Sequence, residues 1–177
     1  YVARFTVTVS PPQSQPQPPS TAAWRYDFGL AGSPVAAGYA AVTPASRYSA
    51  AAGFGWTAWG IDGRDRGAAA GAAELTRDFA TGTDNSFAVD LPDGDYDVTV
   101  TLGDAAYAHG PMGVYLQGAQ VDAVSTAAGQ FAERTYRARV AGGRLVLGLR
   151  NLGRAGDQFC IAALTIAAVD ASGPRVL

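Results

Sequence analysis

Short runs of alternating apolar and polar residues, separated by turn residues, recur along most of this chain. Phe87, Val89 and Leu91 occupy alternate positions, and after a Pro-Asp-Gly sequence the alternation resumes from Tyr96 to Leu102. Successive side chains of a β-strand point to opposite faces, so this period predicts strands with one buried face. Between these runs no segment of ~10 to 15 residues has a helical period. We therefore expect an all-β protein.

The turn residues between these runs predict how the strands connect. Pro-Asp-Gly at residues 92–94 and the pair Gly142-Gly143 each lie between two alternating runs, and we interpret each as the turn of a β-hairpin. The chain has 177 residues, which is enough for one domain with a full core. Hairpins at short spacing and the apolar run FCIAALTIAAV predict an antiparallel β-sandwich, with a jelly roll as its specific form.

Composition divides the chain into four segments. Residues 1–10 alternate like a strand, and we interpret them as the last strand of a preceding domain, with an extra edge strand of the main domain as the alternative. Residues 11–21 are rich in Pro, Gln and Ser, which favours an extended linker. The sandwich is expected to span residues 22–169, and residues 170–177 are expected to form a tail or linker.

Charge and cysteine content restrict the partners. The formal net charge is -2 without a cluster of either sign, so the sequence lacks the basic stripe that attracts nucleic acid or an anionic membrane. No apolar stretch reaches the roughly 18 residues of a membrane span. The single cysteine, Cys160, lies in an apolar run and is expected to pack as a small hydrophobic residue. We expect a monomer without nucleic-acid or membrane partners.

The sequence gives little support for a metal-binding loop or for a catalytic site. Counting from Asp93, the sixth position of an EF-hand loop would be Val98 instead of Gly, and the single His109 cannot build a site of several imidazoles. No G-x-S-x-G motif supplies an activated serine. We expect no catalysis and no cofactor, while a structural calcium ion stays open. A carboxylate pair for glycoside hydrolysis also stays open among the loop residues Asp62, Asp65, Asp104 and Asp157.

The irregular segment 29–71 has the composition of a sugar-binding surface. Sugar rings stack on flat aromatic side chains, and their hydroxyl groups need fixed donors and acceptors. Because loops gather at the ends of a sandwich, we predict a site built from the segments GFGWTAW, RDRG and DAAYAHG. Its stacking residues would be Trp56 and Tyr107, and its polar residues would be Asp65, Arg66, Asp104 and Asp157. In the alternative interpretation, the aromatic residues plug the end of the sandwich and Arg64-Asp65-Arg66 pins the loop through an ion pair.

An ordered set of motifs resembles a known family. In chain order the motifs are YDFG, GYAAVTPASRYSAAAGFGW, RDRG, LTRDF, FAVDLPDGDYDVTVTLGDAAYAHGPMGVYLQG and GDQFCIAALTI. Together they resemble the galactose-binding-like jelly-roll module that precedes the catalytic domain in rhamnogalacturonan acetylesterase-like esterases and that occurs in agarases. They are also similar to malectin-type carbohydrate-binding domains. The resemblance covers about residues 24–167.

This resemblance implies a non-catalytic carbohydrate-binding module of a secreted bacterial enzyme that acts on polysaccharide. Such a module would target the enzyme to plant or algal polysaccharide of the pectic or galactan type, outside the cell. Its partners would be carbohydrate and the neighbouring domains of the same polypeptide. The alternative function is a structural spacer or docking domain without a ligand of its own.

Overall fold

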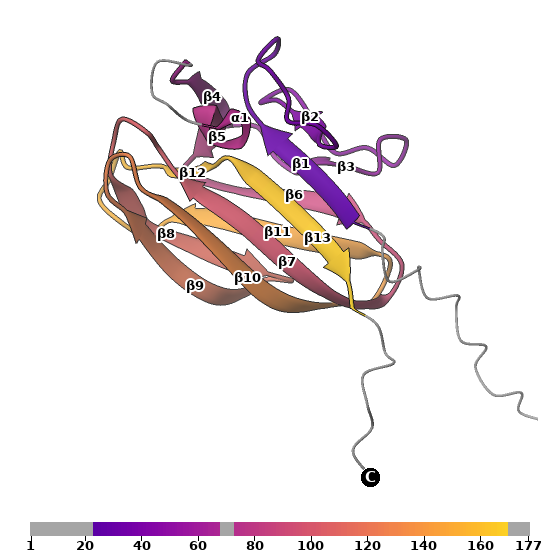
Figure 1. The fold of residues 1–177 in the computed structure, drawn as a ribbon. Helices are drawn as coiled ribbons and strands as arrows, with labels where there is room; N and C mark the ends of the chain where they lie inside the picture. Colours follow the sequence, from indigo (N-terminus) through magenta and orange to yellow (C-terminus); the bar gives the residue numbers. More distant parts are fainter. Residues whose placement is uncertain (1–22, 68–72, 170–177) are drawn as a thin grey trace, which may run out of the picture.

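The computed structural model describes residues 23–67 and 73–169, and these residues form three β-sheets and one short helix. The predictions made for residues 1–10, 11–21 and 170–177 lie outside the described residues. Two five-stranded sheets face each other as the layers of a sandwich (Figure 1). The prediction of an all-β, antiparallel sandwich is confirmed.

The two large sheets interleave strands that are far apart in the sequence. The first sheet has the order β10 (Phe131–Val140), β7 (Gly94–Gly103), β13 (Ala163–Ala168), β1 (Ala23–Phe28) and β2 (Ala40–Val42). The second has the order β3 (Phe54–Trp56), β6 (Asp84–Asp90), β11 (Arg144–Asn151), β8 (His109–Leu116) and β9 (Ala119–Thr126). Neighbouring strands within the two sheets run antiparallel, apart from β1 and β2, which are parallel.

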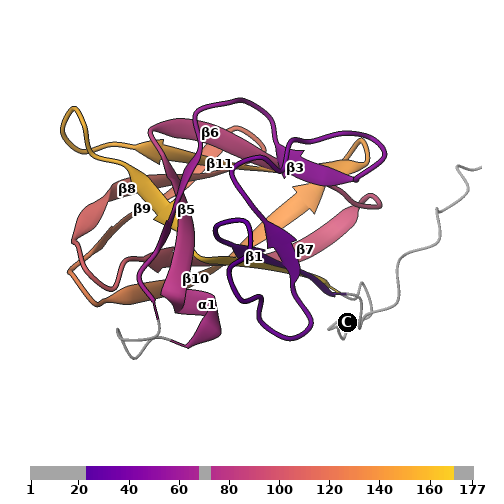
Figure 2. The ribbon, with the colours of Figure 1, turned by 90° about the horizontal axis from the view of Figure 1, so that it is seen from above.

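A small third sheet closes one end of the sandwich. It has the order β12 (Phe159–Ile161), β5 (Asp78–Gly82) and β4 (Asp62–Asp65), and the one-turn helix α1 (Glu74–Arg77) leads into β5. Figure 1 shows β4, β5 and α1 gathered at this end, and Figure 2 shows α1 next to β5. Ala162 separates β12 from β13, so the chain passes there from the small sheet into the first large sheet. The described residues include no helix long and apolar enough to cross a membrane.

The core follows the period of the strands. On β7 the side chains of Tyr96, Val98, Val100 and Leu102 are fully buried, whereas the residues between them face partly outward. Strands of the opposite sheet contribute Leu145, Leu147 and Phe87, among others, to the same core. Burial of each such aliphatic or aromatic side chain contributes ~1.5 to 3 kcal/mol, which makes this core the main source of stability.

Both predicted hairpins are wrong. Strand β6 pairs with β3 and β11, and β7 pairs with β10 and β13, so residues 91–93 carry the chain from one sheet to the other. Residues 141–143 likewise connect β10 of the first sheet to β11 of the second. Alternation shows which face of a strand is buried. The same alternation occurs whether the next strand pairs with that strand or lies across the core, so it cannot distinguish a hairpin from a connection between sheets.

The acidic residues around the first of these turns have structural roles. Asp93 Oδ1 accepts hydrogen bonds from the N–H groups of Gly142 (2.8 Å) and Gly143 (2.7 Å), which ties the two inter-sheet turns together. Asp95 and Asp97 lie on the outer face of β7 and form ion pairs with Arg139 and Arg137 of β10. The interpretation of these aspartates as turn and surface residues is confirmed.

Candidate functional site

Two adjoining cavities lie where the loop after β7 meets the small sheet. The smaller has a volume of about 80 Å³ and is lined by Arg64, Arg66, Phe79, Thr81, Asp104, Tyr107, His109 and Gln158. The larger has a volume of about 420 Å³ and is lined by Ala108, His109, Gly110, Ser125, Thr126, Gly156, Asp157 and Gln158. His109 and Gln158 line both, and we call the two cavities together the His109 groove.

Gly103, the last residue of β7, allows the chain to turn into this groove. Its φ of +148° is rarely adopted by other residues, and a Cβ atom there would lie 2.4 Å from the carbonyl oxygen of Gln130. The backbone can therefore bend sharply just before Asp104. This bend brings the carboxylate of Asp104 inside the molecule.

Asp104 lines the smaller cavity, and its side chain is fully buried. Arg66 binds it in a bidentate manner, because Nε donates to Oδ1 at 2.8 Å and Nη2 donates to Oδ2 at 2.6 Å. The N–H of Ala106 donates to Oδ1 at 2.8 Å, and His109 Nε2 lies 3.1 Å from Oδ2. Both carboxylate oxygens thus have partners that compensate for the loss of water.

These partners keep Asp104 ionised. Burial raises the pKa of its carboxyl group, but the hydrogen bonds from Arg66, Ala106 and His109 outweigh burial and lower the pKa to about 2. A depressed native pKa stabilises the folded state above the unfolded-state value of about 4, and the contribution is lost as the pH falls through about 2. We therefore expect acid to destabilise the groove, whereas neutral pH keeps this contribution intact.

We expect Asp104→Asn to reduce the acid sensitivity of folding. The difference in unfolding free energy between the wild type and this variant should shrink by about 2 kcal/mol between pH 5 and pH 2, because only the wild type has this carboxylate to protonate. Urea denaturation at a series of pH values measures the difference, and other acidic groups cancel between the two proteins. Parallel pH curves would contradict the assignment.

Aromatic rings flank the guanidinium of Arg66. Its Cζ lies 4.9 Å from the ring centroid of Tyr107 and 5.4 Å from that of Phe79, distances at which cation–π attraction operates. Phe79 is buried, whereas Tyr107 is 62% exposed. The arrangement holds an exposed, flat aromatic ring at the mouth of the smaller cavity.

Polar groups at His109 and Thr126 extend the site into the larger cavity. His109 Nδ1 lies 3.0 Å from the carbonyl oxygen of Gln158, on the side of the ring opposite Asp104. Thr126 is buried, and among the described residues its Oγ1 has no hydrogen-bond partner. A buried hydroxyl without a protein partner beside a cavity of this size can bind water or the hydroxyl group of a ligand.

The structure brings together some of the predicted site residues. Tyr107, Arg66 and Asp104 line the smaller cavity, and Asp157 lines the larger. Asp65 instead accepts two hydrogen bonds from Arg77, at 2.9 and 2.7 Å, outside both cavities. Successive side chains of β4 alternate in direction, so Asp65 points away from the side that Arg64 and Arg66 share. Its role is the loop-pinning ion pair of the alternative interpretation, with Arg77 as the partner.

The prediction that Trp56 stacks on a ligand is wrong. Trp56 is fully buried, with ring centroids of Phe28 and Phe87 at 5.4 and 5.3 Å, and its Nε1 donates to the carbonyl oxygen of Thr43. The segment GFGWTAW forms β3 at the edge of the second sheet, so the alternation of that strand directs Trp56 into the core. The exposed aromatic residue of this segment is Trp59, which contacts Arg47 and lines neither cavity of the groove.

Sequence reasoning missed Phe79, Thr126 and Gln158 as groove residues and considered His109 only for metal binding and catalysis. Phe79 belongs to the strand sequence DFATG, whose residues are all buried, and such a sequence looks like ordinary core. Thr126 and Gln158 are polar residues at strand ends without any local signal of function. Only the folding of three distant segments to one end of the sandwich brings them together.

Comparisons with known proteins agree with this architecture. The chain is 34% identical over 158 residues to beta-agarase A of Zobellia galactanivorans, covering 87% of this chain and 28% of that protein. It is 36% identical over 149 residues to the uncharacterized esterase YxiM of Bacillus subtilis, covering 81% of this chain and 36% of that protein. The chain thus spans about a third of the length of these curated relatives.

The crystal structure of the YxiM protein has the same fold. It superposes with a TM-score of 0.68 at 29% identity, covering 84% of this chain and 40% of that structure. Residues 24–167 match a family described as beta-agarase/YXIM esterase-like, galactose-binding domain-like, and this range includes nearly all of the described sandwich. The chain therefore belongs to the galactose-binding-domain-like family found in beta-agarase and YXIM-like esterases.

Proposed function

We propose that the chain is a non-catalytic carbohydrate-binding module and that the His109 groove holds the sugar. The observation that carries this proposal is the exposed ring of Tyr107, which is fixed by Arg66 at the mouth of a cavity with ordered polar groups. Sugar recognition requires this combination of a flat apolar surface and fixed hydrogen-bonding groups. Two relatives carry the names beta-agarase and esterase, which supports a role for this module beside such enzymes.

The charges of the groove favour an uncharged sugar. Two of the three guanidinium nitrogens of Arg66, Nε and Nη2, donate to Asp104, and Arg64 is paired with Asp62. Asp157 adds a further negative charge to the larger cavity. A galacturonate carboxylate would have to displace one of these arginine pairs, so we propose a neutral galactan such as agar over charged pectin. We also propose that the module works outside the cell, as a monomeric part of a secreted bacterial enzyme.

The chemistry of the groove supports binding without catalysis. A glycosidase of the usual type needs one carboxyl group with a raised pKa as proton donor. Hydrogen bonds from Arg64 and Arg77 lower the pKa values of Asp62 and Asp65, and the Arg66 pair outweighs burial at Asp104. Burial also raises the pKa of the Cys160 thiol to about 12, which suppresses the thiolate that a cysteine nucleophile requires.

One observation favours the alternative function of a structural spacer. Asp104, Arg66 and His109 satisfy one another's hydrogen bonds without a ligand, so this cluster can hold the loop after β7 against the small sheet by itself. A spacer would retain the cluster and the fold but would show no affinity for sugar.

The test is a calorimetric titration with agar, galactan and galacturonate oligosaccharides. We expect a dissociation constant of about 10 μM to 1 mM for a neutral oligosaccharide, since a single small module must also displace bound water from the sugar. Tyr107→Ala should weaken binding by about 1 to 2 kcal/mol, or roughly 5- to 30-fold, through loss of the stacking surface. Calorimetry is preferable to fluorescence, because no tryptophan lines either cavity.

Two further variants locate the site. Thr126→Val removes the unpartnered hydroxyl at nearly constant shape and should weaken binding without reducing stability. Trp59→Ala removes another exposed aromatic ring away from the groove and should leave affinity unchanged. No heat with any of the three sugar classes would support the spacer, and binding that is insensitive to Tyr107→Ala and Thr126→Val would place the site elsewhere.

A further inference from the structure

A separate cavity lies on the open side of the sandwich, between the edges of the two large sheets. It has a volume of about 290 Å³, and the described residues that line it all differ from those of the His109 groove. Strand β2 pairs with β1 only from Tyr26 onward, so Trp24 lies at a free edge of the first sheet. Trp24 and Tyr26 line the cavity from this sheet, and Phe54 of the edge strand β3 lines it from the other. We call it the Tyr26 cavity.

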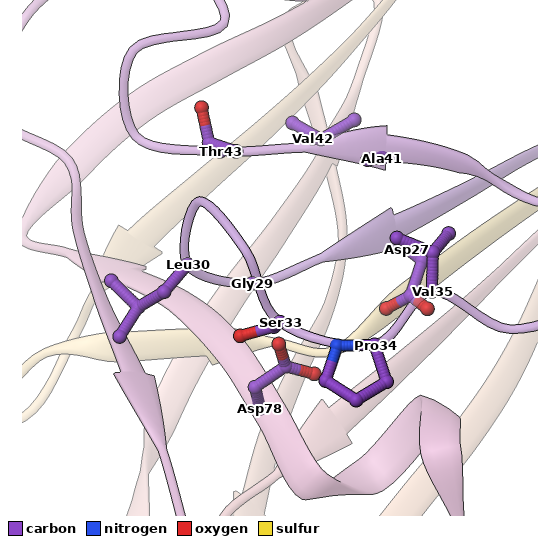
Figure 3. Close-up of a pocket in the computed structure, with 10 residues that line it drawn as sticks. All are labelled: Asp27, Gly29, Leu30, Ser33, Pro34, Val35, Ala41, Val42, Thr43 and Asp78. Atoms are coloured by element: carbon purple, nitrogen blue, oxygen red, sulfur yellow. The ribbon is translucent and has the colours of Figure 1, made fainter.

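The alternation of β1 directs Tyr26 toward this cavity. Consecutive residues of a strand point to opposite faces, so Asp27 faces the other way. Figure 3 shows Asp27 and Asp78 among the residues that line a small cavity of about 10 Å³ on that other side. Tyr26 faces the second sheet, where its ring centroid lies 4.9 Å from that of Phe54 and 5.3 Å from that of Phe87. The phenol ring therefore forms the inner wall of the Tyr26 cavity.

The hydroxyl group of Tyr26 is a buried polar group that the protein leaves unused. The residue is 4% exposed, yet its hydroxyl group makes no hydrogen bond to any described residue. A buried tyrosine hydroxyl usually has a hydrogen-bond partner. Burial and the negative charge of Asp90 raise the pKa of Tyr26 to about 12, so the hydroxyl group stays protonated at neutral pH and can donate. Its partner can come only from water or from a ligand in the cavity.

Fixed polar and aromatic groups surround this hydroxyl group. Asp90 lines the cavity and is ionised, because a hydrogen bond from Arg144 lowers the pKa of its carboxyl group, and the Tyr48 hydroxyl also donates to it. A carboxylate can accept about four hydrogen bonds, so Asp90 has capacity for a ligand hydroxyl group. Trp24 is half-buried, and Tyr96 holds its ring edge-on at a centroid distance of 5.8 Å. The cavity thus has ordered aromatic walls beside a donor and an acceptor.

We propose that the Tyr26 cavity is a second carbohydrate site, which holds one pyranose unit against its aromatic walls with hydroxyl groups bonded to Tyr26 and Asp90. Its volume is near the lower limit of ligand-binding clefts, roughly 300 Å³, which suits a single ring. A pyranose ring has an apolar C–H face and a polar edge, and this combination matches flat aromatic surface beside fixed hydrogen-bonding groups. The site stands on its own residues, whether or not the groove binds sugar.

The two sites should differ in their preference for charge. Arg144 neutralises Asp90, whereas Arg25 is an exposed lining residue that forms no salt bridge within residues 23–67 and 73–169. A sugar carboxylate can pair with Arg25 without displacing a protein partner. Galacturonate should therefore bind the Tyr26 cavity at least as tightly as galactose does, in contrast to the preference of the groove for an uncharged sugar.

The test is a titration of the full chain with galactose and with galacturonate, followed by tryptophan fluorescence. Trp24 lines the Tyr26 cavity and no tryptophan lines the groove, so the signal reports on the Tyr26 cavity. We expect a saturable change with a dissociation constant on the order of 1 mM for each sugar, and the same change in Tyr107→Ala. A groove without affinity for sugar would leave this response intact. An inert Tyr26 cavity would leave the calorimetric effect of Tyr107→Ala intact, so the two proposals fail separately.

Matched variants connect this response to the cavity. Tyr26→Phe removes only the hydroxyl group and should weaken binding roughly 3- to 10-fold without lowering the melting temperature, because no protein hydrogen bond is lost. Ala52→Gln enlarges an exposed lining residue and should block the cavity, whereas Ala51→Gln changes an exposed neighbour outside the lining and should bind as the wild type does. The proposal is overturned if neither sugar changes the fluorescence of the wild type, or if Tyr26→Phe and Ala52→Gln both bind as the wild type does.

Discussion

Trp56→Ala is expected to reduce the unfolding free energy by about 3 to 5 kcal/mol, one of the largest effects available in this chain. The indole ring is fully buried between Phe28 and Phe87, so its removal opens a cavity in a cluster of aromatic rings from both sheets. It also removes the donor to the carbonyl oxygen of Thr43. For a domain of this size the melting temperature should fall by roughly 10 °C or more, which differential scanning calorimetry can measure.

Trp59→Ala is the matched control. Trp59 lies three positions further along the same segment, but its side chain is 76% exposed and contacts Arg47 across a cation–π distance of 4.7 Å. The same chemical change should therefore cost no more than about 1 kcal/mol. Equal losses in the two variants would show that Trp56 is not a core residue.

Arg66→Ala is expected to reduce the unfolding free energy by about 3 kcal/mol. Breaking a buried ion pair from one side leaves the other charge without compensation, which typically costs ~3 to 5 kcal/mol, and the partial exposure of Arg66 places this pair near the lower limit. Asp104 would keep its hydrogen bonds from Ala106 and His109 but would lose its bidentate partner. Urea denaturation at neutral pH measures the loss.

Two further variants test whether the loss comes from breaking the Arg66–Asp104 pair or from removing an arginine side chain in general. Arg77→Ala removes an arginine that binds Asp65 in the same bidentate manner, but both partners are about a quarter exposed, so we expect a much smaller loss than for Arg66→Ala. Adding Asp104→Asn to Arg66→Ala should restore part of the stability, because it removes the stranded charge. A double variant that is less stable than Arg66→Ala alone would falsify this account of the pair.

The sequence predicts where the strands lie, but it predicts only in part which strands pair with each other. Alternation predicted the buried faces of β6 and β7 correctly, because an apolar face is needed wherever a strand meets the core. The pairing partner depends on contacts between segments that are far apart in the chain. The turn at Gln117-Gly118, where both residues have positive φ, does join the paired strands β8 and β9, whereas Pro-Asp-Gly joins different sheets.

The site was predicted in part for the same reason. RDRG and DAAYAHG were expected to meet, and they do, because Arg66 reaches Asp104 across the loops and the rings of Tyr107 and Phe79 enclose the guanidinium. Trp56 was assigned to the ligand because an aromatic residue among glycines resembles a loop residue. In the folded chain the surrounding residues form an edge strand, and its inward face takes the indole.

The sequence by itself determined the all-β class, the inward faces of the strands and the family, because these depend on local periodicity and on ordered motifs. The tertiary structure alone decided which sheet each strand joins, that Trp56 belongs to the core, and that Asp27 and Asp78 share one cavity. Asp27 and Asp78 lie 51 positions apart in the sequence, and both stand among ordinary strand residues. Their meeting is a consequence of packing β1 against β5, and no local pattern encodes a contact between such distant segments.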